Sequence, residues 1–306
     1  MGKELSERSI DLSRLLVGAQ LPALPQSAIR VIELSHDPEN GPAEFAVPIE
    51  SEPGLASQVL RFVNSSYFGF SREISSVKLA IILVGIRTIK NFVLWSAVYN
   101  LVPNPRCGAL DLKKLWQDSL RRGLFARTLG KTLGAKDVEV PFAAALLQDM
   151  AVPLLAKELP EEYADLLEKR EGGQVRLSDL EQQAFGWNHA KAAKVIASQW
   201  NLPAELGNLV DRHTEADVLL QEPDVTPAQK AIVLSALLPS SADETWVEYS
   251  QFETAFKCLD DTIAPTARDL LGQIDEQFSD FAPLLRLPAP SQPLVACYDQ
   301  QAEVTI

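Results

Sequence analysis

The helical spacing of apolar residues is the feature that most constrains this chain. In one early segment the apolar side chains fall one, three and four positions apart, at Ala28, Ile29, Val31, Ile32 and Leu34. This spacing puts them on one face of a helix. Pro25 suits the first turn, and Pro38 ends the helix because a residue before proline avoids helical geometry. The pattern recurs along most of the chain and strand signals are scarce, so the sequence predicts an all-α fold.

Proline-rich breaks divide these helices into groups. The connector Pro103–Pro105 separates two helical subdomains, which we place at residues 21–104 and 105–220. A short helical segment (1–20) precedes them, and a C-terminal helical extension and tail (221–306) follow, with the part around Pro288 expected to be irregular. The predicted helices of both subdomains and the extension include 77–84, 86–101, 112–133, 140–155, 161–170, 179–185, 190–200, 204–213, 228–238, 252–259 and 267–285.

Two helix starts carry a specific signature. Ser178 with Glu181, and Thr226 with Gln229, have the spacing of a capping box, in which each side chain bonds a backbone N–H of the other residue. Pro227 sits where the first helical residue of the second box would lie. We therefore expect helices to begin at both places.

Charge limits the partners that this chain can bind. The 306 residues carry 41 acidic and 28 basic side chains, a formal net charge of −13. Binding to nucleic-acid phosphates or to an anionic membrane needs a basic face, so both partners are disfavoured. A protein partner is not, and a homodimer stays open.

Cysteine use and hydropathy point to a cytoplasmic protein. The 3 cysteines, Cys107, Cys258 and Cys297, are far apart and form no C-x-x-C pair, which favours a reducing compartment. The amino-terminal residues are charged and lack the apolar stretch of a secretory signal. The longest apolar run, around Leu79–Val84, is too short to cross a bilayer.

The segment from Val77 to Leu101 resembles a helix-turn-helix, with the turn at Gly85. Its second helix offers only Arg87 and Lys90 as basic residues, among apolar neighbours. We expect that face to be buried rather than to read a DNA groove.

An ordered series of short motifs resembles the HDOD family. The series runs LPALP (21–25), LASQVLRFVNSSYFG (55–69), SVKLAI (76–81), Val84-Gly85, Trp116 to Ser119, FGWNHA (185–190) and WNLP (200–203). The positions that match the family motifs are Asn64, Ser65, Gly69, Gly85, Trp116, Gly186 and Trp200. The resemblance covers about residues 21–214 and implies a bacterial, all-helical domain with a regulatory or signal-transducing role.

Each motif position also has a purely structural interpretation. Asn64 and Ser65 follow a helix, where short polar side chains bond free backbone groups. Trp116, Trp187 and Trp200 lie next to leucines or alanines on helical faces, so we expect them to be packing residues.

The resemblance extends to the HD phosphohydrolases, in which histidine and aspartate ligands from different helices hold metal ions bridged by the aspartate. It places the family's ligand positions at Asp118, Gln148-Asp149, His213-Thr214 and Ala236, with Ala151 where a glycine normally closes the His-Asp motif. A glutamine amide is a poor ligand beside imidazole and carboxylate, and alanine cannot bind a metal. The resemblance therefore implies a degenerate pocket in which phosphodiester hydrolysis is not expected.

Asp149, His189 and His213 survive from the ligand set. With Asp118 they could complete a mononuclear four-ligand site, which is the alternative to our expectation that no metal or other cofactor is bound. We favour hydrogen-bonded roles: His189 in a network at a helix start, and His213 bonding free carbonyls at a helix end.

The sequence leaves two functions in competition. The first is a non-catalytic signalling module, a pseudoenzyme that binds a protein partner. The second is a residual metal-dependent phosphohydrolase or nucleotide sensor that uses the old pocket. Gly172-Gly173 lacks the Lys-Ser or Lys-Thr of a phosphate-binding loop, and the Gly-Tyr-Pro signature of cyclic-dinucleotide phosphodiesterases is absent. These observations favour the first function.

Overall fold

Helices make up all of the regular structure that the computed structural model describes, which comprises residues 10–19, 21–259, 265–283 and 285–304. Helix α1 (Leu12–Gly18) comes first in the chain, and the first group is α2 (Gln26–Leu34), α3 (Pro42–Glu50), α4 (Pro53–Val63), η1 (Ser66–Phe68), α5 (Val77–Val84) and α6 (Ile86–Leu101). The second group is α7 (Leu112–Thr132), α8 (Glu139–Leu147), α9 (Ala151–Glu158), α10 (Pro160–Lys169), η2 (Glu171–Gly173), α11 (Leu177–Phe185), α12 (His189–Gln199), α13 (Ala204–Arg212) and α14 (Ala216–Leu219). The extension holds α15 (Pro227–Ala236), α16 (Tyr249–Lys257), α17 (Ala267–Phe281) and α18 (Leu294–Val304). The predicted all-α fold is confirmed.

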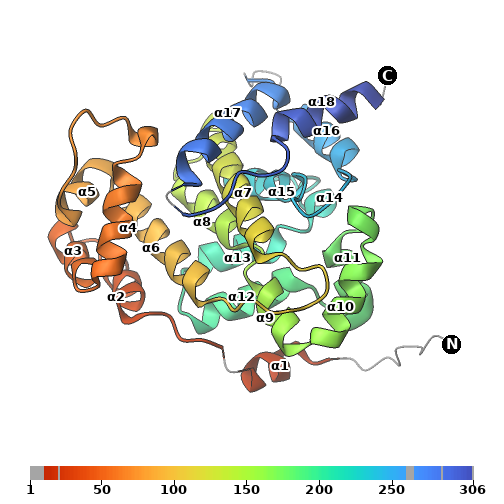
Figure 1. Ribbon diagram of the computed structural model, residues 1–306, viewed down its shortest axis with the longest axis horizontal. Coiled ribbons are helices and arrows are strands. Elements are labelled where there is room, and N and C mark those ends of the chain that lie inside the picture. The colour runs from red at the N-terminus through yellow and green to blue at the C-terminus, as the bar shows by residue number, and fades with distance from the viewer. Residues whose placement is uncertain (1–9, 20, 260–264, 284, 305–306) are drawn as a thin grey trace.

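The helices form two groups that share one hydrophobic core. Helices α2 to α6 gather at one end of the molecule, and the later helices surround α7 at the other (Figure 1). Helix α7 packs against α8, α15 and α17, so the C-terminal extension is built into the second group rather than attached to its surface. Helix α6 joins the groups because it contacts both α2 and α8.

The close approach of α7 and α8 depends on Gly123. A Cβ atom added at this position would lie 2.9 Å from Leu146 of α8, closer than any relaxed contact. The absence of a side chain at Gly123 therefore lets α7 and α8 approach each other closely.

The helix-turn-helix resemblance does not lead to a DNA-reading face. Helix α6 is buried along its length from Asn91 to Val98, as the sequence predicted. Arg87 pairs with Asp137 in the connection between α7 and α8. The would-be recognition helix is thus part of the core.

The polar motif residues Asn64 and Ser65 end α4, as predicted. The Asn64 side chain donates to the carbonyls of Leu60 and Ile74 and accepts from the Ile74 backbone N–H, and Ser65 donates to the Phe62 carbonyl. Asn64 therefore fixes the return of the chain to α4 after the turn.

The other motif residues serve packing and turns. Trp116, Trp187 and Trp200 are buried, and the indoles of the last two donate to the backbone carbonyls of Ile10 and Pro22. These bonds hold the amino-terminal segment against the second group. The motif glycines Gly69, Gly85 and Gly186 all have positive φ, a conformation that L side chains rarely adopt.

Three sequence predictions about local structure are wrong. The segment 140–155 is two helices, because Pro153 has no N–H to bond the Asp149 carbonyl and the chain kinks between α8 and α9. The tail is not wholly irregular, since α18 follows Pro293. The Ser178–Glu181 capping box does not form, because Glu181 is fully buried and bonds other residues. The Thr226–Gln229 box is confirmed.

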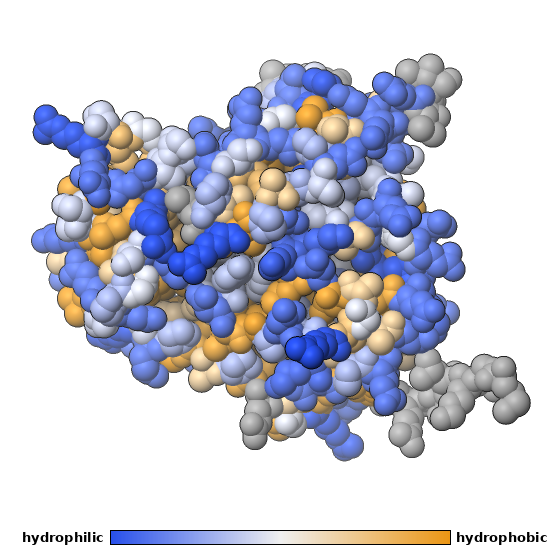
Figure 2. Space-filling view, viewed as in Figure 1, coloured by the Kyte–Doolittle hydropathy of each residue, from blue (hydrophilic) through white to orange (hydrophobic). Residues whose placement is uncertain are grey.

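The surface is mostly hydrophilic in the view of Figure 2, with hydrophobic atoms showing between polar groups. The stretch Glu139–Glu158 is long and apolar enough to cross a membrane by length and composition, but 94% of its most apolar part is buried inside the protein. Core helices meet the same criterion. On α5, Leu79, Ile82 and Leu83 remain exposed.

We predict opposite effects of two Gly→Ala substitutions within helices. Gly123→Ala is expected to lower the free energy of unfolding by about 1–3 kcal/mol, because the added methyl group overpacks the α7–α8 contact. Gly272→Ala of α17 meets nothing within 4 Å and is expected to raise it by about 0.5–1 kcal/mol through helix propensity. Urea denaturation of both variants measures the difference, and equal effects would contradict this account of the helix contact.

Candidate functional site

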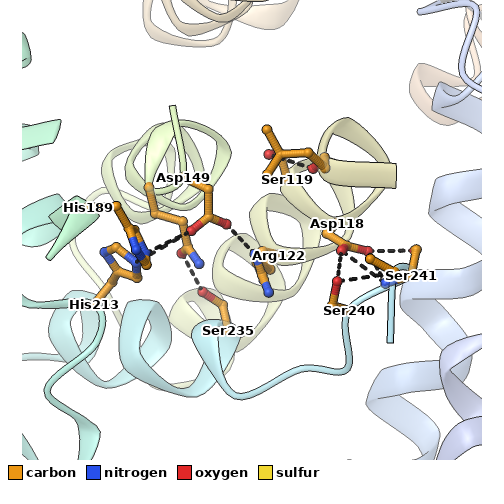
Figure 3. A network of polar contacts seen from close by, with 12 residues as sticks. Asp118, Ser119, Arg122, Asp149, His189, His213, Ser235, Ser240 and Ser241 are labelled. Atoms are coloured by element: carbon orange, nitrogen blue, oxygen red, sulfur yellow. Dashed lines mark hydrogen bonds and ion pairs between the residues drawn. The ribbon is translucent and has the colours of Figure 1, made fainter. Parts of the chain in front are cut away.

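The ends of four helices converge on one buried polar cluster. Asp149 comes from the kink between α8 and α9, His189 is the first residue of α12, and His213 directly follows α13. The Asp149 Oδ1 atom lies 3.3 Å from His189 Nε2 and 3.6 Å from His213 Nε2, and the two Nε2 atoms are 3.2 Å apart. Figure 3 shows both imidazoles on one side of Asp149. The structure thus brings together three of the residues that the sequence singled out.

A second set of contacts orients both imidazoles. His189 Nδ1 lies 2.6 Å from Glu181 Oε2, and that oxygen also accepts the His189 backbone N–H at 2.8 Å. The other Glu181 oxygen accepts from Tyr163 Oη at 2.6 Å. His213 Nδ1 lies 2.6 Å from the Val210 carbonyl, as expected for a histidine at a helix end. Because a carbonyl only accepts, Nδ1 of His213 carries the proton and its Nε2 offers a lone pair to the cluster.

The cluster holds one extra proton, on His189. Burial alone would lower the pKa of His189, but the charge of Glu181 and hydrogen bonds to Asp149 and Glu181 outweigh it and raise the pKa to about 10. Burial lowers the pKa of His213, which is therefore neutral. An imidazolium at His189 can donate from Nε2 to Asp149 or to the lone pair of His213.

Arg122 of α7 is the site residue that sequence reasoning missed. Its guanidinium Nη1 pairs with Asp149 Oδ2, on the side away from the histidines (Figure 3). Burial would raise the pKa of Asp149, but the Arg122 charge and the histidine hydrogen bonds hold it well below its usual range. The signal was present in the sequence: Arg122 lies four residues after Asp118, so both fall on one face of α7.

Asp118 is not part of the histidine cluster. It accepts hydrogen bonds from Ser240 Oγ at 2.7 Å and from the Ser241 backbone N–H and Oγ at 2.8 and 2.5 Å. Figure 3 shows it on the far side of Arg122 from Asp149. The four-ligand site considered from the sequence is therefore not what the structure shows, and the grouping of possible ligands among the described residues is Asp149, His189 and His213.

The remaining ligand positions of the family carry residues with structural contacts. Gln148 Oε1 lies 3.4 Å from Ser235 Oγ, and Thr214 Oγ1 lies 3.3 Å from Asn188 Nδ2. Ala236 lines the same cleft with no donor atom. Neither an amide nor a methyl group replaces the imidazole and carboxylate ligands of an HD centre.

The donor set fits one metal ion but not a bridged pair. Two ligands at about 2.0–2.1 Å from a tetrahedral zinc lie about 3.3 Å apart, close to the separations of the three donor atoms here. Hydrogen bonds to both Nδ1 atoms are also the outer contacts that metal-binding histidines have. A bridging aspartate needs its second oxygen, and Arg122 already holds Asp149 Oδ2 with a fixed positive charge.

The cluster forms part of the wall of a cleft of about 120 Å³. Its charged lining residues are Asp111, Asp118, Arg122, Asp149, Arg170, Arg176, His189, Asp243 and Glu248, with the second histidine of the cluster, His213, beside them. Carboxylates and guanidinium groups both line the cleft, so it is polar without being strongly acidic or basic.

Comparison with known proteins agrees with this architecture. The model of the HDOD domain matches residues 21–216. The chain is 24% identical over 196 residues to an uncharacterized protein of Treponema pallidum, covering 63% of this chain and 37% of that protein. The chain thus spans well under half the length of this relative.

Solved structures share the fold. An HDOD domain protein of unknown function from Geobacter sulfurreducens superposes with a TM-score of 0.64 at 17% identity, covering 96% of this chain and 93% of that one. A Shewanella amazonensis protein provisionally named a phosphohydrolase gives a TM-score of 0.65 at 19% identity, covering 89% and 95%. At these identities the likeness establishes the fold.

We predict that the contribution of His189 to stability depends on pH. Because its pKa is raised to about 10 from 6.5, the stabilisation is complete below pH 6.5 and is lost as the pH rises through 10. Denaturation of the metal-free protein and of His189→Gln should give a difference in unfolding free energy that shrinks between pH 7 and pH 10, by on the order of 3 kcal/mol. His36→Gln, at an exposed histidine, is the control, and a His189→Gln difference independent of pH would contradict the assignment.

Proposed function

This chain belongs to the HDOD domain family, and on that premise we propose that it is a non-catalytic signal-transduction module that acts by binding a protein partner. The Arg122–Asp149 ion pair carries the proposal. Asp149 is the aspartate of the degenerate His-Asp motif, and in a hydrolase it would bridge two metal ions. The Arg122 guanidinium occupies the second oxygen of the Asp149 carboxylate. Because arginine is not deprotonated in proteins, its positive charge stays where a second metal ion would bind.

The chemistry of the cleft supports the same conclusion. Hydrolysis of a phosphodiester in this superfamily needs metal-activated water and a polarised phosphoryl oxygen. Gln148 and Ala236 supply no anionic ligand, and the Asp118 oxygens accept hydrogen bonds from Ser240 and Ser241. The chain's own residues thus balance one another's charges, as in a structural network.

A protein partner is the interaction that the described surface suits. Leu79, Ile82 and Leu83 of α5 and Val47 of the adjacent α3 are exposed apolar side chains. Apart from Lys78, α5 is apolar on its exposed side as well as its buried side, and such a helix is normally covered. This surface is one on which another protein could dock, which agrees with a module that receives its signal in trans.

A second candidate function is a sensor that holds a single divalent ion. The convergence of Asp149 Oδ1, His189 Nε2 and His213 Nε2 favours it. So do the outer hydrogen bonds that the two imidazole Nδ1 groups donate to Glu181 and to the Val210 carbonyl. When bound, such an ion would supply Lewis acidity and displace the proton of His189. The chain's residues would hold and orient it.

We predict no phosphoester turnover by the purified protein. Cyclic dinucleotides and p-nitrophenyl phosphodiesters, incubated with Mn²⁺, Fe²⁺ or Zn²⁺, should be hydrolysed no faster by the wild type than by Asp149→Asn, because a bridged metal pair cannot form. Turnover that disappears in Asp149→Asn but persists in the exposed control variant Asp217→Asn would overturn the proposal.

Metal content separates the two candidates. The non-catalytic module is expected to purify without stoichiometric metal and to bind Zn²⁺ no more tightly than its His213→Gln variant. One ion per chain in elemental analysis, lost in His213→Gln and kept in His36→Gln, would support the sensor instead.

A further inference from the structure

The loop between α15 and α16 crosses the cleft and is held at both sides. We call residues 239–248 the strap. On one side Asp118 of α7 accepts from Ser240 and from the backbone and side chain of Ser241. On the other side Arg170 Nη2 lies 2.5 Å from Asp243 Oδ2. The strap therefore forms part of the cleft wall, together with Arg122 and Asp149.

The two glycines after α10 form the seat of the strap. The Gly172 carbonyl accepts from the Glu244 backbone N–H at 2.9 Å. Gly173 has φ +102°, and a Cβ atom there would lie 2.5 Å from the Asp243 side chain. Gly172-Gly173 is not a phosphate-binding loop; it leaves the space into which Asp243 fits.

The strap places carboxylates against the arginines of the cleft. Asp243 pairs with Arg170, and Glu248 lies 3.4 Å from Arg176 Nε. These carboxylates satisfy only part of what the guanidinium groups can donate, since each group has five N–H donors. The Nε atoms of Arg170 and Arg122 are buried without a hydrogen-bond partner among the described residues.

We propose that the cleft is a binding site for a phosphate-bearing small molecule, and that Asp243 and Glu248 of the strap compete with this ligand for its arginines. The proposal rests on the proposed function, in that the ligand is sensed and not turned over. Arg122, Arg170 and Arg176 present planar donor sets of the kind that bind phosphate oxygens. A volume of about 120 Å³ has room for one such group.

Ligand binding would release the strap and so change the surface of the protein. An oxyanion on Arg170 and Arg176 displaces Asp243 and Glu248, which loosens the part of the strap between the serines bonded to Asp118 and the buried Trp246. The cleft would thus be coupled to the C-terminal extension, since α16 packs on α15 and α15 packs on α7. Ligand binding is thereby coupled to the second helix group and its C-terminal extension.

Calorimetric titration of matched variants tests the competition. Inorganic phosphate and ATP are titrated into wild type, Asp243→Asn/Glu248→Gln and Glu244→Gln. Removing the two competing carboxylates should strengthen binding by about tenfold or more, because the ligand no longer has to displace them from Arg170 and Arg176. Glu244→Gln removes a carboxylate from the same strap at an exposed residue that pairs with no arginine in the described part of the chain, and this variant should bind like the wild type.

Comparing ATP with inorganic phosphate identifies which kind of phosphate the site binds. Tighter binding of ATP than of inorganic phosphate to Asp243→Asn/Glu248→Gln assigns the site to nucleotides, and the reverse assigns it to the free ion. Arg170→Gln/Arg176→Gln should lose either binding. Absence of a gain over Glu244→Gln with both probes would overturn the site, whereas conversion of ATP to ADP would overturn the non-catalytic proposal alone.

Hydrogen exchange of the wild type supplies a measurement that needs no variant at the arginines. Deuterium uptake of peptides from residues 239–248 should rise in phosphate relative to sodium chloride of equal ionic strength. Gly173→Ala, which unseats Asp243, should raise this uptake without ligand, while Gly134→Ala, with a similar positive φ and open space around it, should not. Uptake unchanged by phosphate and by Gly173→Ala would contradict a displaceable strap.

Discussion

The ion pair between Arg122 and Asp149 is the interaction on which the rest of the site depends. A carboxylate that is buried to 6% exposure stays charged only if a partner compensates for the water it has lost. Arg122 provides that compensation from α7, and the two histidines complete the shell on the other oxygen. Asp149 therefore does not bridge metal ions. Its negative charge connects α7, α12 and the end of α13 through Arg122, His189 and His213.

This arrangement turns a site for cations into a closed network of charges. His189 carries a proton on the side where an ion would bind, and Glu181 balances this charge at the other ring nitrogen, Nδ1. Asp118 accepts hydrogen bonds from serines of the strap. Breaking one partner of such a network costs more than the network itself contributes, because a charge is then left unpaired. The same physics makes the cleft responsive: an incoming anion can replace a carboxylate of the strap at little cost in unpaired charge.

The sequence predicted the fold well and the site in part. Helical spacing located most helices, since burial on one face is a local pattern that single segments reveal. The kink at Asp149 was missed because the apolar run continues on both sides of it. Pro153, which cannot bond the Asp149 carbonyl, was the signal in the sequence. Glu181 matched a capping pattern, yet its burial against Tyr163 and His189 depends on helices far away in the chain. The contacts of Arg122 and of the strap residues were missed for that reason, because tertiary packing sets them. The spacing from Asp118 to Arg122 places both residues on one face of α7 but does not identify their partners.

The most direct test of this account is the number of metal ions that the cluster can hold. Anomalous diffraction from crystals soaked in Mn²⁺ would count them at Asp149, His189 and His213. The account predicts no more than one peak, with Arg122 still on Asp149 Oδ2. Two peaks about 3.5–4 Å apart, bridged by Asp149 with Arg122 displaced, would contradict it.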